Sequence, residues 1–78
     1  MRKVYRDFSR EDFPVAAIHA TLLKVLDHGG PAEVIIIGVP FSLRLDLALP
    51  LYRAQSPLTR YLLRKIEARG GKIMVGYR

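Results

Sequence analysis

Apolar side chains recur along this chain with two different periods, and the alternation between these periods predicts a mixed α/β fold. Residues 2–8 (RKVYRDF) alternate in the way that is typical of a strand. Residues 33–39 contain four successive β-branched side chains, from Val34 to Ile37. A strand without a polar face needs cover on both faces, so this segment is predicted to be the centre of a sheet.

Residues 15–28 form the first predicted helix. Its apolar side chains are spaced by three or four positions, at Val15, Ile18, Leu22, Val25 and Leu26. Asp12 is expected to cap this helix, with Pro14 in the first turn, where a missing backbone N–H does no harm. Gly29 and Gly30 supply the stop signal.

The second predicted helix ends at Arg69. Ser56 is a favourable N-cap, and Pro57 then occupies the first helical position. The predicted apolar stripe consists of Leu58, Tyr61, Leu62 and Ile66. A pair of glycines ends the helix, and residues 72–77 (KIMVGY) follow as a closing strand that is apolar on both faces.

Residues 43–51 alternate leucine with other residues, which predicts a strand that Pro50 confines to an edge or ends. The alternative is a broken helical turn over residues 46–53. With the strand, the chain is a two-layer α+β sandwich with the βαββαβ, ferredoxin-like order, in which the last strand lies beside the first. Without it, the chain is a minimal βαβαβ layer with a parallel sheet. Both make residues 1–78 a single small α/β domain.

Two helices that share one face of the sheet leave the other face uncovered. Half of the residues are apolar, which is rich for a chain of 78 residues, and a core of this size is thin. We therefore expect the second face to be covered by another copy of the chain, giving a homodimer or a higher oligomer.

The net charge of +6 arises entirely in the C-terminal third. Residues 1–52 contain six basic and six acidic side chains, whereas residues 53–78 contain seven basic side chains and one acid, Glu67. The predicted nucleic-acid-binding residues are Arg53, Arg60, Arg64, Lys65, Arg69 and Lys72. Cations in rows one helical turn apart, beside tyrosine rings, fit a phosphate backbone and its bases, so DNA or RNA is the expected partner. The alternative is a solvated helix face with Tyr61 in the core.

Other kinds of site find little support in the composition. The chain has no cysteine, which excludes a disulfide, a thiolate zinc site and a thiol nucleophile within these residues. His19 and His28 are nine positions apart, which is not the spacing of a helical metal pair. We therefore expect no enzyme activity, no metal and no cofactor. A catalytic site would require a pocket at the turn of residues 38–42, at the carboxyl end of a strand.

No apolar run is long enough for a signal peptide or a membrane span, so a cytoplasmic location is expected. Asparagine is absent and Gln55 is the single glutamine, a balance that is typical of heat-adapted proteins.

Residues 4–39 resemble the first half of the small sulfur-carrier domains of the TusA and SirA kind, with a strand, a helix entered at a proline and an apolar strand. The Cys-Pro-x-Pro motif of that family corresponds here to Glu11-Asp12-Phe13-Pro14, in which only the last proline matches and the sulfur-bearing cysteine is missing. Residues 58–75 are similar to the helix and strand that lead to the cysteine of DsrE-like proteins, and again no cysteine follows. The resemblance implies a sulfur-relay fold without the sulfur-carrying activity.

Two functions follow as hypotheses. The first is a small non-enzymatic, self-associating module that binds nucleic acid through the basic face of its C-terminal helix. The alternative is a cysteine-less scaffold or partner subunit related to the sulfur-relay domains.

Overall fold

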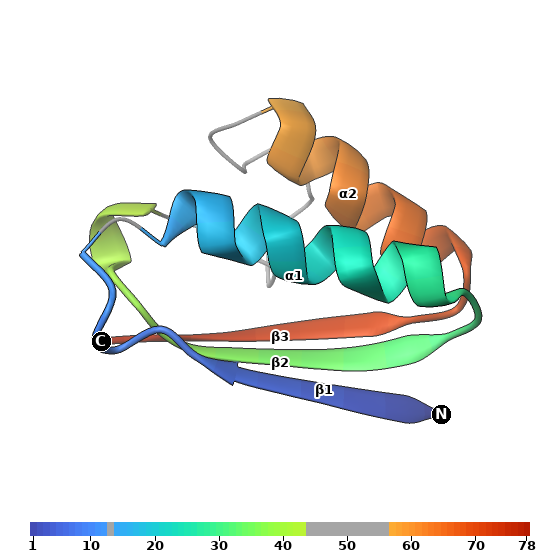
Figure 1. Cartoon of the computed structure of the whole chain (residues 1–78), viewed down its shortest axis with the longest axis horizontal. Helices are drawn as coiled ribbons and strands as arrows, with labels where there is room; N and C mark the ends of the chain where they lie inside the picture. The colour runs from blue at the N-terminus through green and yellow to red at the C-terminus, as the bar shows by residue number, and fades with distance from the viewer. Residues whose placement is uncertain (13, 44–56) are drawn as a thin grey trace.

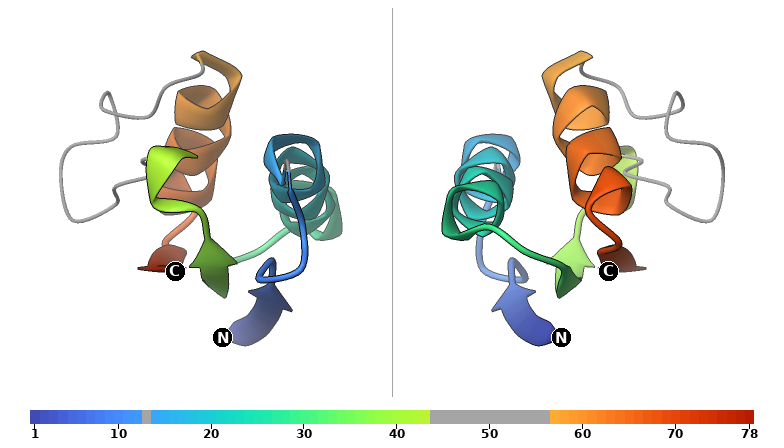
Figure 2. Two further views of the ribbon diagram at one scale, coloured as in Figure 1. Left: turned by 90° about the vertical axis from the view of Figure 1, so that its left-hand side faces the viewer. Right: turned by 90° about the vertical axis from the view of Figure 1, so that its right-hand side faces the viewer.

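The computed structural model describes residues 1–12, 14–43 and 57–78. Three strands and two α-helices alternate along it, with one short 3₁₀ helix: β1 (Arg2–Asp7), α1 (Val15–His28), β2 (Ala32–Val39), η1 (Phe41–Leu43), α2 (Pro57–Ala68) and β3 (Lys72–Tyr77). The strands form one sheet in the order β1-β2-β3, and both pairs are parallel. Both α-helices lie on the same side of this sheet (Figure 1, Figure 2).

The two-layer α+β architecture is therefore confirmed, and the ferredoxin-like order is not. The last strand pairs with β2 rather than with β1, so the described strands follow the alternative parallel βαβαβ order. Two successive crossovers of the same hand that move in one direction across a sheet place their helices on one face. Residues 44–56 lie outside the described residues. They include most of the predicted strand over residues 43–51, as well as Arg53 and Ser56.

The core lies between the sheet and the two helices. The buried apolar side chains are Phe8, Ile18, Leu22, Val25, Ala32, Val34, Ile36, Val39, Leu62, Leu63 and Ile66. In β2, the alternate residues Val34 and Ile36 point into this core, whereas Ile35 and Ile37 are half-buried on the other face of the sheet. The expectation that this strand is covered on both faces is thus met on one face only within the described chain.

Helix α1 begins differently from the sequence prediction. Pro14 is its N-cap residue, with φ of −78°, and no side chain caps the first turn. The Pro14 carbonyl accepts the first helical hydrogen bond from the Ile18 N–H at 2.8 Å. Asp12 lies two residues before this cap, so its carboxylate is not the capping group that we predicted. The predicted stop is confirmed, because the Gly29 N–H donates to the Leu26 carbonyl with φ of 81° at Gly29.

Helix α2 is rotated relative to its predicted apolar stripe. Leu62 and Ile66 are buried as expected, but the other buried positions are Thr59 and Leu63, and Leu58 is exposed. Thr59 is accepted on the inner side because its hydroxyl has a partner on α1, the imidazole of His19. The polar residue Thr59 is thus buried, whereas its apolar neighbour Leu58, which was predicted to be buried, is exposed.

The turn that follows β1 packs closely against Gly38 of β2. Gly38 has φ of 71°, and a Cβ there would lie 2.5 Å from the Ser9 nitrogen and 2.7 Å from Asp7 Oδ1. The Ser9 hydroxyl and N–H both donate to this Asp7 oxygen, at 2.5 and 2.8 Å. Both bonds lower the pKa of Asp7 below its usual value, and the bond from the hydroxyl has the larger effect. Only glycine provides both the space and the backbone conformation that the turn requires.

Candidate nucleic-acid interface

The outer face of α2 carries the exposed part of the predicted basic surface. The buried side of this helix packs on α1 and the sheet, and the opposite side presents Tyr61 and Arg64 to solvent, with Lys65 exposed next to them. Arg60 lies one turn before Arg64 and is half-buried. Arginine, lysine and leucine all have a high helix propensity, which favours the helical conformation of this segment.

Tyr61 distinguishes the two interpretations of this face. Its side chain is 56% exposed, so its predicted place in the apolar stripe of α2, which the alternative of a solvated face also assigns to the core, is wrong. The Lys65 ammonium lies over its ring, 5.5 Å from the centroid, within the range of a cation–π interaction. Leu58, one turn earlier, is 47% exposed. One solvent-facing surface thus combines an aromatic ring, an aliphatic side chain and two cations. We call it the Tyr61 surface (Leu58, Tyr61, Arg64 and Lys65).

Arg69 has a structural partner. Its Nη1 donates to the carbonyl oxygen of Leu26, at 2.6 Å, near the C-terminal end of α1. The Leu26 carbonyl thus accepts from Arg69 as well as from the Gly29 N–H, and a cation at this position interacts favourably with the negative end of the helix dipole. Arg69 therefore ties the end of α2 to the end of α1, although it is exposed and was predicted as a binding residue.

Lys72 lies on a different surface. It starts β3 and is paired in register with Glu33, whereas the next pair, Val34 with Ile73, faces the helices. Because side chains alternate along a strand, Lys72 points to the open face of the sheet, away from α2. The predicted set is therefore divided: Arg60, Arg64 and Lys65 stay together, Lys72 is on the far side of the sheet, and Arg53 lies outside the described residues.

A second cationic cluster was missed by the sequence prediction. Arg2 and Arg6 are four residues apart in β1 and point toward α1, where Lys24 faces them. The signal was present, since residues i and i+4 of a strand lie on the same face. It was hidden because the first 52 residues have no net charge, although the acids of this segment are not among the residues that line the cluster.

His19 joins the two helices. Its Nε2 and the Thr59 hydroxyl share a hydrogen bond of 2.5 Å, and burial lowers the pKa of the imidazole. This geometry agrees with the structural role that is usual for a lone histidine on a helix. Within the ranges 1–12, 14–43 and 57–78, no group of three side chains of the metal-binding types comes together.

According to the sequence, a catalytic site would require a pocket at the turn of residues 38–42. There the Phe41 ring lies edge-on against Tyr77, with 5.7 Å between the centroids, and the nearby carboxylate of Asp7 is bonded to Ser9. The side chain of Arg78 donates to the carbonyls of Ser9 and Glu11. These groups hold the loop after β1 in place.

Comparison with protein-family models, with curated proteins and with solved structures gives no match. The likeness to sulfur-relay domains therefore stays a prediction. Among the described helices, none combines the length and the apolar character that crossing a bilayer requires.

Proposed function

We propose that this chain is a small nucleic-acid-binding module whose contact surface is the Tyr61 surface of α2. The observation that carries the proposal is the exposure of Tyr61 beside Lys65 and Arg64. A core tyrosine would have left only a solvated row of charges. An exposed ring next to cations supplies the two parts of single-strand recognition, a stacking platform and a contact to phosphate.

The same surface favours single strands over duplexes. A ring can stack on a base only when that base is not already stacked in a helix, and each base–aromatic stack contributes about 1–3 kcal/mol. A duplex would meet only the cations, whose contribution falls as salt is added. We therefore expect tighter binding to a single strand than to a duplex of equal length.

Fluorescence anisotropy with a labelled single-stranded oligonucleotide, titrated at several salt concentrations, tests this proposal. We expect log K to fall linearly with log[salt], with the slope reduced by about 0.7 in Arg64→Gln and again in Lys65→Gln, as each phosphate contact is lost. Arg10→Gln is the matched control, because it removes the same charge from an exposed residue in the connection between β1 and α1. Absence of binding at low salt, or an equal loss in the control, would contradict the proposal.

We further propose that the module self-associates through the open face of its sheet. Tyr5, Ile35 and Met74 are neighbours in one row across the three strands on this face. Tyr5 is 61% and Met74 50% exposed, and Ile35 between them is half-buried. Such an apolar row gains from contact with another apolar surface.

Charge favours one arrangement of the two copies. A two-fold axis along the Tyr5–Met74 row places Lys3 of one copy opposite Asp7 of the other, because these residues flank Tyr5 on the same face of β1. An axis parallel to the strands instead places Lys3 opposite the second copy's Lys72, which is unfavourable. The second copy therefore packs with its strands antiparallel to the first.

The interface is small. Six residues on each of three strands give a face of roughly 14 by 20 Å, against roughly 800 Å² per partner in a standard interface. We therefore expect a weak dimer, which sedimentation equilibrium would reveal as a mass that rises with concentration. Met74→Lys should make the chain monomeric, whereas Leu23→Lys, at an equally exposed position of α1, should not. A monomer at all concentrations would contradict self-association.

A further inference from the structure

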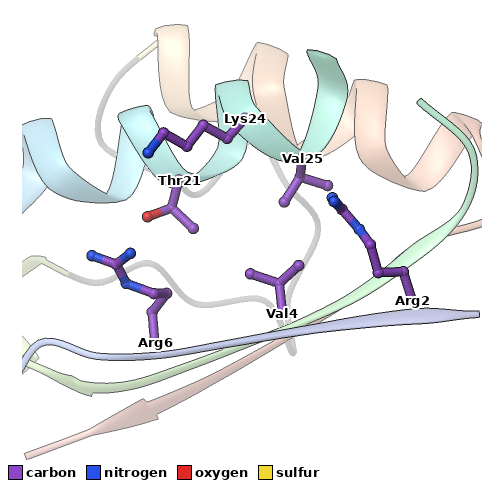
Figure 3. A pocket seen from close by; sticks show the side chains of 6 residues that line it. All are labelled: Arg2, Val4, Arg6, Thr21, Lys24 and Val25. Atoms are coloured by element: carbon purple, nitrogen blue, oxygen red, sulfur yellow. The ribbon is translucent and has the colours of Figure 1, made fainter. Parts of the chain in front are cut away.

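A separate pocket of about 200 Å³ lies between β1 and α1. It is lined by Arg2, Val4, Arg6, Thr21, Lys24 and Val25. Figure 3 shows the side chains of β1 pointing up from the edge of the sheet, Thr21 and Val25 of α1 pointing down toward them, and Lys24 extending along α1. The cationic groups of Arg6 and Lys24 lie toward one end of the pocket and the guanidinium of Arg2 toward the other.

The pocket gathers three positive charges from two elements. Among the described residues that line it, three are basic and none is acidic. Like charges that share a partly enclosed site repel one another, and an anion between them removes this repulsion. The edge-strand position alone accounts for charged side chains on β1, but it does not account for the ammonium of Lys24 on α1, which lies at the same end of the pocket as Arg6.

Arg2 provides an independent observation. Its Nε is buried and has no hydrogen-bond partner among the described residues. A buried donor without an acceptor is unusual in a folded protein. A bound anion that drew the Arg2 side chain toward it would give this N–H a hydrogen-bond acceptor, and a guanidinium fork binds two oxygens at once.

The remaining lining residues shape the pocket. Val4 and Val25 form an apolar wall. The Thr21 hydroxyl donates to the Ala17 carbonyl at 2.9 Å, so it adds no further donor to the cavity. A pocket of this volume has room for one tetrahedral oxyanion and is smaller than the roughly 300–1,000 Å³ of sites for drug-sized ligands.

We propose that this pocket binds a phosphate group through Arg6 and Lys24, with the guanidinium of Arg2 adding positive charge from the other end. A phosphate can offer oxygens to the Arg6 fork and to the Lys24 ammonium at once, and its charge of up to two suits a pocket lined by three cations better than the single charge of a carboxylate. The phosphate is either free or an ester on a small molecule. The pocket lies at the β1 edge of the sheet. The Tyr61 surface is on α2, which lies on the same face of the sheet but toward the β3 edge (Figure 2), so the two proposals are independent.

Titrations with inorganic phosphate, methyl phosphate and dimethyl phosphate at constant ionic strength, followed by NMR of the arginine side-chain Nε–H groups, test this proposal. We expect saturable shifts with inorganic phosphate, larger for the Arg6 signal than for the Arg2 signal. Equal binding of methyl phosphate would indicate an ester as ligand, and preference for inorganic phosphate would indicate the free ion. Dimethyl phosphate, with one negative charge, should bind at least tenfold more weakly.

Arg6→Gln and Lys24→Gln should each weaken phosphate binding about tenfold, and Arg10→Gln, which removes a charge outside the pocket, should not. Shifts that do not saturate, or that chloride reproduces at the same ionic strength, would overturn the proposal. So would phosphate binding that survives both pocket variants but is lost in Arg64→Gln. That last result would place the anion on α2 and leave the proposed function intact.

Discussion

The Nε2 atom of His19 lies 2.5 Å from the Thr59 hydroxyl oxygen, and this bond joins α1 to α2 inside the helical layer. The two residues are far apart in the sequence, so the bond contributes only once both crossovers have folded. Because the imidazole is partly buried there, its pKa is lowered, and the neutral form is the one that the folded state favours.

This relationship predicts a specific dependence of stability on pH. Since the folded state holds the pKa of His19 below its unfolded value, the unfolded chain binds the proton more readily. The stabilisation is therefore complete above about pH 6.5, the usual histidine value, and is lost as pH falls toward the lower pKa of the folded state. Urea unfolding at a series of pH values should show this fall in the free energy of unfolding.

The fall should be reduced in His19→Gln and should persist in His28→Gln, which removes the other imidazole of α1. If His19→Gln retains the full fall between neutral pH and pH 5, another group causes it.

Gly38→Ala should destabilise the fold strongly. The backbone at Gly38 has φ of 71°, and the added Cβ would meet the Ser9 backbone and the Asp7 carboxylate. A residue other than glycine in this conformation costs about 1–3 kcal/mol even without a clash, so we expect a loss of about 3 kcal/mol or more in thermal or urea unfolding. Gly30→Ala is the control, because Gly30 also has positive φ but open space around it. Equal losses in the two variants would refute the steric part of this prediction.

Arg69→Gln separates stability from binding. Its guanidinium bonds the Leu26 carbonyl, so removing it should lower the free energy of unfolding by about 1 kcal/mol. Oligonucleotide affinity should change less than in Arg64→Gln, which leaves stability nearly unchanged. The opposite ranking in the two assays would show that Arg69 is the contact and Arg64 the structural residue.

The periodic elements are the part of this fold that the sequence predicts well. The strand over residues 33–39, both α-helices and the closing strand appear within one or two residues of their predicted limits. The strand order is harder, because local periodicity does not say which strands pair. The rotation of α2 buries Thr59 against His19, which lies 40 positions away and which no local pattern connects to it.

The candidate site was predictable only in part. Arg64 and Lys65 are exposed on α2 as their spacing indicates, but the bond of Arg69 to α1 and the orientation of Lys72 depend on tertiary structure. The pocket residues Arg2 and Lys24 are brought together by the first crossover. A charge count along the chain averages such residues with distant acids.

The most direct test of the proposed function is a ¹⁵N–¹H NMR titration of the chain with a short single-stranded oligonucleotide at low salt. We predict that the largest shifts fall on the exposed positions of α2, at Tyr61, Arg64 and Lys65, and that Tyr61→Ala weakens binding while leaving the spectrum of the fold unchanged. Shifts confined to the β1–α1 pocket or to the open face of the sheet, or no shifts at all, would contradict the account.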